Sequence, residues 1–265
     1  MRVVKRSGET EEFDPAKAIN AILRAGLSQE DAERLMEEVR PRLYDGMSTE
    51  ELYRIIRSRL PSCNASRYSL KKAILLMGPD GHSFETLVGR VFQELGYHVE
   101  VRQLLKGHCV THEVDLVISK GSSKGMVECK YHNAPNYKSS IQEALYTYSR
   151  FLDLKDSHGF DAPWLVTNTK FSGDVVQYAR CVGMRTVCWK CTEEKGLERL
   201  VEKANVYPVT VLSLRKNEWR TLLDHDLVLC RDLIERKEEV RRLFPRETAD
   251  RVIAKAAEFL ECVKR

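Results

Sequence analysis

Two runs of apolar and β-branched residues near the middle of the chain predict a pair of neighbouring β-strands. The first is Val114–Ile118 and the second is Met126–Tyr131, and the polar, glycine-containing segment 120–125 between them predicts a turn. Further strands and helices are expected on both sides of this pair. They are a helix over Ser83–Leu95, a strand over Tyr97–Leu105, a helix from Ser139 or Ser140, a strand over Trp164–Thr167, a helix over Ser172–Cys181 and a strand over Arg185–Trp189.

The first 80 residues predict a small hairpin followed by four helices. The hairpin strands are expected at Arg2–Lys5 and Glu11–Phe13. Residues suited to helix N-termini precede each apolar periodic segment. The predicted helices begin at Asp14-Pro15, run from Ser28 to about Tyr44, run from Ser48 or Thr49 to Arg59, and cover about Arg67 to Met77.

Apolar residues recur at helical spacing from Asn205 to the end of the chain. A proline- and glycine-rich boundary lies at 78–81. We therefore expect three domains, over 1–80, 81–204 and 205–265. The predicted class is an α/β (α+β) multidomain fold with a mostly helical first part, a central mixed sheet flanked by helices, and a small helical C-terminal domain.

Composition limits the kind of protein more than its activity. The chain has 265 residues, of which 43% are hydrophobic, and its net charge of +4 does not by itself require nucleic acid. Neither a membrane-spanning run nor a signal peptide is recognisable, so a cytoplasmic protein without membrane contact is expected. The eight cysteines are expected to be reduced thiols, because the chain is long and carries no recognisable secretion signal. A structural zinc site at Cys188 and Cys191 is not favoured, because the second pair of ligands that it needs is missing.

One segment carries basic residues without any acidic ones. Between Leu52 and Pro79 the chain has six Lys or Arg residues and no Asp or Glu. The segment could form a nucleic-acid-binding face, and a solvated or phosphate-binding helix surface is an equally good interpretation. The residues are Arg54, Arg57, Arg59, Arg67, Lys71 and Lys72.

The central strand pair also carries the candidate chemistry. Side chains alternate along a strand, so Glu128 and Lys130 share one face, and pairing of the strands can bring Asp115 beside them. Two adjacent carboxylates repel unless a cation lies between them, and oxygen ligands suit Mg²⁺. The lysine could contact a phosphate or orient an attacking water.

This pattern, D-x12-E-x-K followed by Gln142 and Tyr146, resembles the PD-(D/E)xK nucleases and especially the Mrr-like restriction endonucleases. The resemblance covers roughly residues 81 to 190 and includes Glu85 in the opening helix. It implies that Asp115, Glu128 and the Cys129 carbonyl hold Mg²⁺ or Mn²⁺ and that Lys130 positions water. It further implies that Glu85 lies close to the metal and that Gln142 orients these groups or touches DNA.

The first 75 residues or so resemble the ATP cone, the nucleotide-binding regulatory domain of ribonucleotide reductases. The resemblance rests on Val4-Lys5-Arg6-Ser7-Gly8 and the residues that follow it. Lys5, Arg6 and Lys17 can converge on phosphates, while Glu11 and Thr49 offer hydrogen bonds to a base or ribose. ATP or dATP is therefore the expected effector.

We thus expect a Mg²⁺-dependent deoxyribonuclease that ATP or dATP could regulate and that could form a homodimer. A junction-resolving nuclease is a second interpretation, and a nucleotide-responsive DNA-binding protein with an inactive nuclease fold is a third. The C-terminal domain weakly resembles SAM-like or helix-hairpin-helix modules. His108 and His112 lie near Asp115 in sequence, where packing roles are favoured over a role in the reaction.

Overall fold

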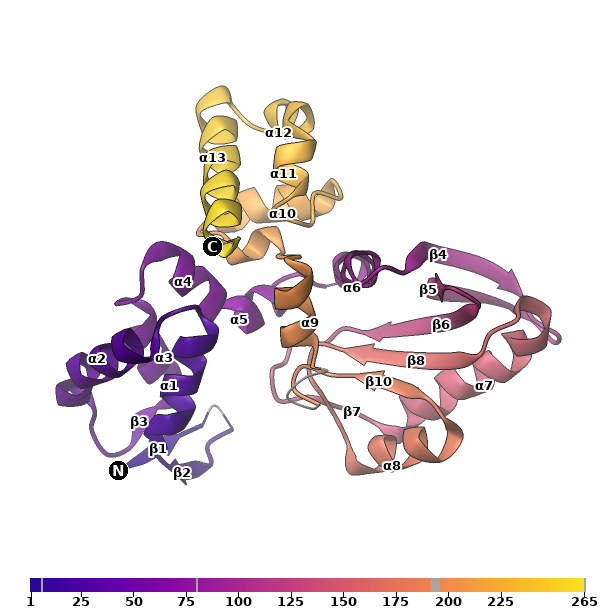
Figure 1. The fold of residues 1–265 in the computed structure, drawn as a ribbon, viewed down its shortest axis with the longest axis horizontal. Helices are drawn as coiled ribbons and strands as arrows, with labels where there is room; N and C mark the ends of the chain where they lie inside the picture. Colours follow the sequence, from indigo (N-terminus) through magenta and orange to yellow (C-terminus); the bar gives the residue numbers. More distant parts are fainter. Residues whose placement is uncertain (6, 80, 192–195, 265) are drawn as a thin grey trace.

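A computed structural model describes residues 1–5, 7–79, 81–191 and 196–264. Figure 1 shows three lobes that meet at a short central helix, α9 (Leu197–Ala204). The N-terminal lobe is mostly helical, the largest lobe contains the main sheet, and the third lobe consists of the C-terminal helices. The predicted α/β multidomain class is confirmed.

The N-terminal lobe begins with the predicted hairpin. Strands β1 (Arg2–Val4) and β2 (Thr10–Glu12) are antiparallel, and a short strand β3 (Met47–Ser48), absent from the sequence prediction, runs parallel to β1. The Asp14 side chain accepts a hydrogen bond from the Ala16 amide at 2.9 Å, as an N-cap should. The helices are α1 (Pro15–Arg24), α2 (Gln29–Val39), α3 (Thr49–Arg57), α4 (Ser62–Tyr68) and α5 (Leu70–Ile74).

Two helix boundaries in this lobe differ from the prediction. α2 ends at Val39 instead of near Tyr44, because Pro41 lacks the amide that would continue the helix, and a 3₁₀ turn follows. The single helix expected near 67–77 is instead α4 and α5. Ser69 separates them, and its hydroxyl bonds back to the Ala65 carbonyl at 2.7 Å, which favours a bend.

The central lobe contains a five-stranded mixed sheet in the order β10-β8-β6-β5-β4. The first three of these strands in the chain form antiparallel pairs, while β8 and β10 run parallel to β6. A separate pair of two-residue strands, β7 and β9, lies beyond the sheet. The strands are β4 (His98–Lys106), β5 (Thr111–Lys120), β6 (Ser123–Lys130), β7 (Lys138–Ser139), β8 (Ala162–Thr167), β9 (Lys170–Phe171) and β10 (Arg185–Val187).

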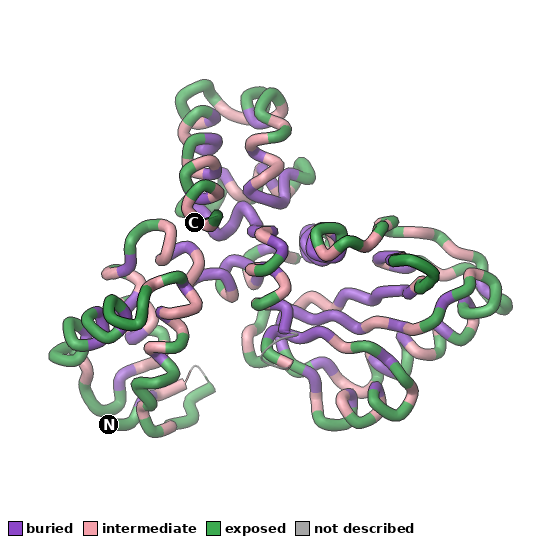
Figure 2. Tube along the Cα trace, in the orientation of Figure 1, coloured by how far each residue is buried: buried purple, intermediate pink, exposed green. Residues whose placement is uncertain are grey.

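Helices cover both faces of this sheet, as the sequence predicted. α6 (His82–Glu94) buries Phe84 and Leu87 against Leu116 and Val127 on one face. α7 (Ile141–His158) and α8 (Gly173–Val182) pack on the other face. Figure 2 shows the sheet buried between these layers. The middle strands of the sheet are therefore mostly covered, whereas every second residue of the edge strand β4 is exposed.

The C-terminal helices pack against the other lobes. One apolar core runs from α5 through α6 and the sheet into this lobe. The Thr210 hydroxyl also donates to the Ala73 carbonyl of α5 at 2.8 Å. Within the described ranges, no helix is long and apolar enough to cross a membrane. The helices are α10 (Lys216–Asp224), α11 (Asp232–Glu235), α12 (Lys237–Leu243) and α13 (Arg246–Val263).

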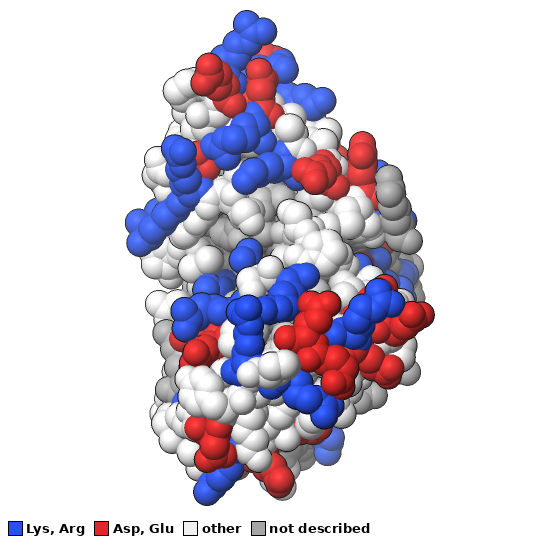
Figure 3. Space-filling view, turned by 90° about the vertical axis from the view of Figure 1, so that its left-hand side faces the viewer, with Lys and Arg blue, Asp and Glu red and all other residues white. Residues whose placement is uncertain are grey.

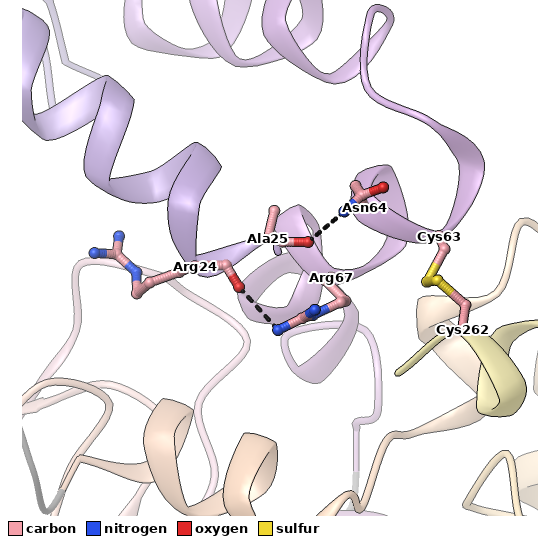
Figure 4. Close-up of a disulfide and its surroundings, with 6 residues drawn as sticks. All are labelled: Arg24, Ala25, Cys63, Asn64, Arg67 and Cys262. Atoms are coloured by element: carbon pink, nitrogen blue, oxygen red, sulfur yellow. Dashed lines mark hydrogen bonds between the residues drawn. A yellow bond between two sulfur atoms is a disulfide. The ribbon is translucent and has the colours of Figure 1, made fainter. Parts of the chain in front are cut away.

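The cysteines correct the prediction of eight reduced thiols. Cys63 in α4 and Cys262 near the end of α13 form a disulfide across 199 residues of chain, and Figure 4 shows how it links the first and last lobes. Cys188 and Cys191 form a second disulfide. The sequence argument placed the chain in a reducing compartment, and the distance along the chain hid the pairing of Cys63 with Cys262. The free thiols are Cys109, Cys129, Cys181 and Cys230.

A tyrosine at the end of β6 fastens the segment between the first two lobes. The Tyr131 hydroxyl donates to the Leu75 carbonyl and accepts from the Gly78 amide, both at 2.8 Å. Only glycine fits at position 78, because a Cβ there would lie 2.3 Å from the tyrosine ring. The N-terminal lobe is thus held against the residue that directly follows Lys130.

Candidate active site

Strands β5 and β6 bring the predicted acidic residues together. Leu116 lies opposite Val127 in the antiparallel pair, so the side chains one position further along are neighbours. The Asp115 Oδ2 accepts a hydrogen bond from the Cys129 amide at 2.7 Å. The strand pairing expected from the alternation of side chains is therefore the one that forms.

Glu128 is the most deeply buried member of this group. Only 3% of the residue is exposed, and both carboxylate oxygens bind cations. Lys130 Nζ donates to Oε1 at 2.7 Å, and Arg150 Nη1 donates to Oε2. The carboxylate is thus paired with two basic side chains, one from its own strand and one from α7.

Arg150 is a candidate that sequence reasoning missed. Its guanidinium lies over the Tyr146 ring, with 4.7 Å between guanidinium carbon and ring centroid, and Nη2 donates to the Tyr146 hydroxyl at 2.8 Å. Gln142, Tyr146 and Arg150 are spaced by four residues and share one face of α7. Extending the Gln-x3-Tyr spacing by one more turn would have identified the arginine.

Burial and mutual repulsion dominate the electrostatics of the site. Burial, and next the charge of Glu128, raises the pKa of Asp115 to about 7. Burial raises the pKa of Glu85, and the charge of Glu128 adds to that shift. Arg102 Nη1 lies 3.6 Å from Glu85 Oε2, and its positive charge opposes this rise in the pKa of Glu85. The carboxylates of Glu85, Asp115 and Glu128 therefore create a region that favours an added positive charge.

The pKa of Lys130 is raised as well, but here the raised pKa favours the charged form. Burial acts to lower the pKa of Lys130, but the Glu128 carboxylate outweighs it through charge and hydrogen bonding, so the pKa is raised. The amine is therefore protonated at neutral pH and serves as a hydrogen-bond donor. It cannot act as a general base while this ion pair is intact.

The donor set fits a hard divalent cation. Among the described residues, no three His, Cys, Asp or Glu side chains are arranged as a ready-made metal cage. Mg²⁺ does not need one, because it keeps several waters and binds through one or two carboxylates. Asp115 and Glu128, with the carbonyl of Cys129 next to Glu128 on β6, are the residues that would hold it, and the Glu85 carboxylate would add negative charge nearby.

Other predicted residues lie elsewhere. Gln142 is exposed in the first turn of α7, and no hydrogen bond to its side chain occurs within the described ranges. His112 Nε2 lies 2.8 Å from Asp153 Oδ2, and the His108 amide donates to the Asp153 carbonyl at 2.9 Å. Both histidines thus connect the β4–β5 turn to α7, in agreement with the packing interpretation.

The residues predicted for nucleotide binding form a more open group. Lys5 Nζ lies 2.9 Å from Glu11 Oε2, and Lys17 Nζ lies 4.0 Å from the same oxygen. Arg6 lies outside the described residues. Thr49, the first residue of α3, lines a cavity of about 420 Å³ beside α1. Glu11 holds the two lysines together, so the group is compatible with phosphates but is neutralised in part by its own carboxylate.

Comparisons with known families divide the chain into three matched regions. Residues 1–77 match the ATP cone domain, residues 77–189 match the restriction endonuclease model of Mrr catalytic domains, and residues 207–260 match the AF1548-like, C-terminal model. The central domain is therefore of the nuclease type, and the first domain is an ATP cone. α9 lies between the second and third regions.

Individual proteins show similarity to this chain. An uncharacterized protein of Archaeoglobus fulgidus is 40% identical over 155 residues, which are 58% of this chain and 88% of the relative. A crystal structure of the protein of unknown function AF1548 is 36% identical, with a TM-score of 0.60, and covers 68% of this chain and 98% of its own. The MspJI restriction endonuclease bound to a 27-mer oligonucleotide covers 68% of this chain and 38% of its own, with 18% identity and a TM-score of 0.37.

The similarity to AF1548 extends over nearly all of that protein and therefore shows the family, while the three matched regions show the domain architecture. The sequence had indicated the cone and the Mrr-like domain, and both are confirmed. The last domain, which the sequence compared with SAM-like modules, matches the AF1548-like, C-terminal model. The chain belongs to the family of AF1548 and combines an ATP cone, a restriction endonuclease domain and an AF1548-like C-terminal domain.

Proposed function

We propose that this protein is a Mg²⁺-dependent deoxyribonuclease whose activity responds to ATP or dATP. The observation that carries the proposal is the convergence of Asp115, Glu128 and Lys130 at the pairing of β5 and β6, inside a domain that matches restriction endonucleases. Mn²⁺ would suit the same oxygen donors.

The chain's own residues suggest how such a site would work. A bound divalent cation supplies positive charge against the scissile phosphate and acidifies nearby water. Lys130 would donate a hydrogen bond to the attacking water or to a phosphate oxygen, since its amine is protonated. Asp115 and Glu128 would hold the cation, and Cys129 would contribute only its carbonyl because its buried thiol has a raised pKa.

Arg150 adds a second cation to this mechanism. Its guanidinium pairs with Glu128. A metal on Glu128 would compete with that pairing, and the freed guanidinium is suited to a phosphate because its planar donors match phosphate oxygens. Arg150 would then neutralise charge on the DNA backbone beside the metal.

The test is cleavage of plasmid, linear and branched DNA, with and without Mg²⁺. Asp115→Asn and Lys130→Met should remove cleavage, whereas the matched controls Asp156→Asn and Lys155→Met, on exposed positions of α7, should cut at the wild-type rate. Preferential cutting of branched DNA would instead favour a junction-resolving enzyme. Binding of DNA without cleavage by the wild-type protein in Mg²⁺ and Mn²⁺ would overturn the proposed activity and favour an inactive nuclease fold.

A further inference from the structure

A cavity of about 420 Å³ lies between the cone and the restriction endonuclease domain. The cone contributes residues of α1, α3, α4 and α5, the nuclease domain contributes Pro135, Trp189 and Lys190, and α9 contributes Glu198 and Glu202. Figure 3 shows the molecule from the side on which the cone lies, with Lys and Arg side chains across the middle of that face and acidic side chains beside them. A cavity of this volume is large enough for a small ligand.

The charges that line the cavity favour an anion. Five lining side chains are basic and three are acidic. Burial, and next the charges of Lys170 and Lys190, lowers the pKa of Lys71, so the lysines repel one another. Within the described part of the chain, neither Lys71 nor Lys72 forms an ion pair with a carboxylate. Their charges are therefore available to a ligand that carries several negative charges.

Aromatic side chains form the apolar part of the wall. Tyr53 and Tyr68 stack with 5.2 Å between ring centroids, and Lys72 Nζ lies 5.9 Å above the Tyr53 ring. Burial raises the pKa of Tyr68 to about 12, so it stays neutral. Cations beside flat apolar surfaces are typical of sites for nucleotides.

Glu198 connects the two sides of the cavity. Its Oε2 lies 3.6 Å from Arg24 Nε on α1 and 3.6 Å from Lys190 Nζ of the nuclease domain. Figure 4 shows the neighbourhood of Arg24, where Arg67 donates to the Arg24 carbonyl at 3.2 Å. One carboxylate therefore binds a cation from each domain and competes with any anion for both of them.

We propose that this cavity binds the phosphates of the nucleotide and that Lys190, from the nuclease domain, is one of their ligands. The inference rests on the proposed control by ATP or dATP and adds to it that the nuclease domain completes the site. Thr49 belongs to the cavity lining, and Lys17, Ala21 and Arg24 share one face of α1, so the cavity continues the group that Lys5 and Glu11 begin. The phosphates replace Glu198 as the partner of Lys190 and Arg24.

Through this arrangement, a nucleotide bound in the cavity can affect the active site. Leu75 and Pro135 line the cavity, and Leu75 accepts the hydrogen bond from Tyr131, the residue after Lys130. Pro135 lies in the loop that leaves β6. A ligand that shifts this wall therefore acts on the strand that carries Glu128 and Lys130.

The experiment is calorimetric titration of the full-length protein with ATP. Lys190→Ala should weaken ATP binding about tenfold, as expected for a lost charge-assisted contact, while Lys190→Arg should bind within about threefold of wild type. Glu198→Gln should bind ATP several-fold more tightly, because it removes the competing carboxylate. Lys237→Ala, at an exposed position on α12, is the matched control and should leave the affinity unchanged.

The outcomes separate this inference from the proposed function. Equal affinities of wild type, Lys190→Ala and Glu198→Gln would overturn the inference and leave nucleotide control through the cone intact. Equal losses in Lys190→Ala and Lys190→Arg would also overturn it, because the charge would not be what matters. Absence of ATP binding by the wild-type protein would overturn both.

Discussion

The restriction endonuclease domain and the cone each gather acidic and basic residues, but they hold them very differently. At the nuclease site, Glu128 is 3% exposed and is fixed by Lys130 and by Arg150. On the cone, Lys5 and Glu11 form their ion pair on the surface, where the lysine side chain is 40% exposed. The same residue types therefore create a stiff, strongly perturbed site in one domain and a solvated, adaptable one in the other.

The difference follows from the elements that carry the charges. Two long strands in the middle of a covered sheet keep Glu128 from water and leave Asp115 half-buried, so these carboxylates pair with cations or change their pKa. The hairpin of the cone is two three-residue strands at the edge of a helical lobe. Buried charges of this kind are suited to positioning for chemistry, and exposed ones to reversible capture of a ligand.

The largest effect on stability is expected when the buried carboxylate of the nuclease site is removed. Glu128→Ala leaves two cations without their partner in a largely buried site, which should cost about 3–5 kcal/mol of unfolding free energy. Urea unfolding followed by the fluorescence of Trp164, which packs in the sheet core, would measure it. A loss no larger than that of the exposed control Glu258→Ala would show that the ion pairs of Glu128 are not desolvated.

A second effect concerns the covalent link between the first and last lobes. The Cys63–Cys262 disulfide closes a loop of 199 residues, so it restricts the unfolded chain. Cys63→Ser should lower the unfolding free energy by about 2–4 kcal/mol under non-reducing conditions. Cys181→Ser, at an exposed free thiol, is the control. If reductant lowers the melting temperature of wild type and of Cys63→Ser equally, the link contributes nothing.

How much the sequence could predict depends on how far apart the interacting residues are. Alternation along β5 and β6 is local, so the residue pattern alone assigns Asp115, Glu128 and Lys130 to one site. Cys63 and Cys262 are 199 residues apart, and no local pattern records their contact. Arg150 is an intermediate case. It lies four residues after Tyr146 on one face of a helix, so the helical spacing could have predicted its place beside Tyr146.

The cavity between domains was beyond the sequence for the same reason. Three of its five basic residues, Arg67, Lys71 and Lys72, belong to the basic segment for which a phosphate-binding surface was one interpretation. What could not be predicted is that Lys190 and Glu198 approach that segment, because their positions depend on how α9 crosses between the lobes. Domain boundaries assigned along the chain do not show which residues of two domains meet in a shared site.

A third, smaller effect is a gain in stability, expected when the charge of Asp115 in the nuclease site is removed. Asp115 has its pKa raised to about 7 by burial first and by Glu128 next, so its ionised form destabilises the fold. Asp115→Asn keeps an oxygen for the Cys129 amide and removes the charge, which should raise the unfolding free energy by about 1–3 kcal/mol at pH 8.

The pH dependence of that gain follows from the raised pKa. The stabilisation from a neutral Asp115 is complete below the unfolded pKa near 4 and is lost as the pH rises through about 7. The difference between Asp115→Asn and wild type should therefore shrink as the pH falls from 8 to 4. Unfolding midpoints across this range, in chelator to remove metal, give the measurement. A constant difference would mean that another group causes the effect.

The smallest effect on stability is expected on the cone, where the ion pair of Lys5 and Glu11 is exposed to solvent. Hydrogen bonding and charge from Glu11 raise the pKa of Lys5, yet both side chains face water, and exposed ion pairs contribute little to folding. Lys5→Ala should therefore leave the unfolding midpoint unchanged. It should still weaken ATP binding, and the difference from wild type should diminish at high salt, because salt screens exposed charges. Lys216→Ala, exposed at the start of α10, controls for loss of a surface charge. A clear loss of stability in Lys5→Ala without loss of ATP affinity would reverse the roles assigned to the two regions, since it would make the hairpin charges structural.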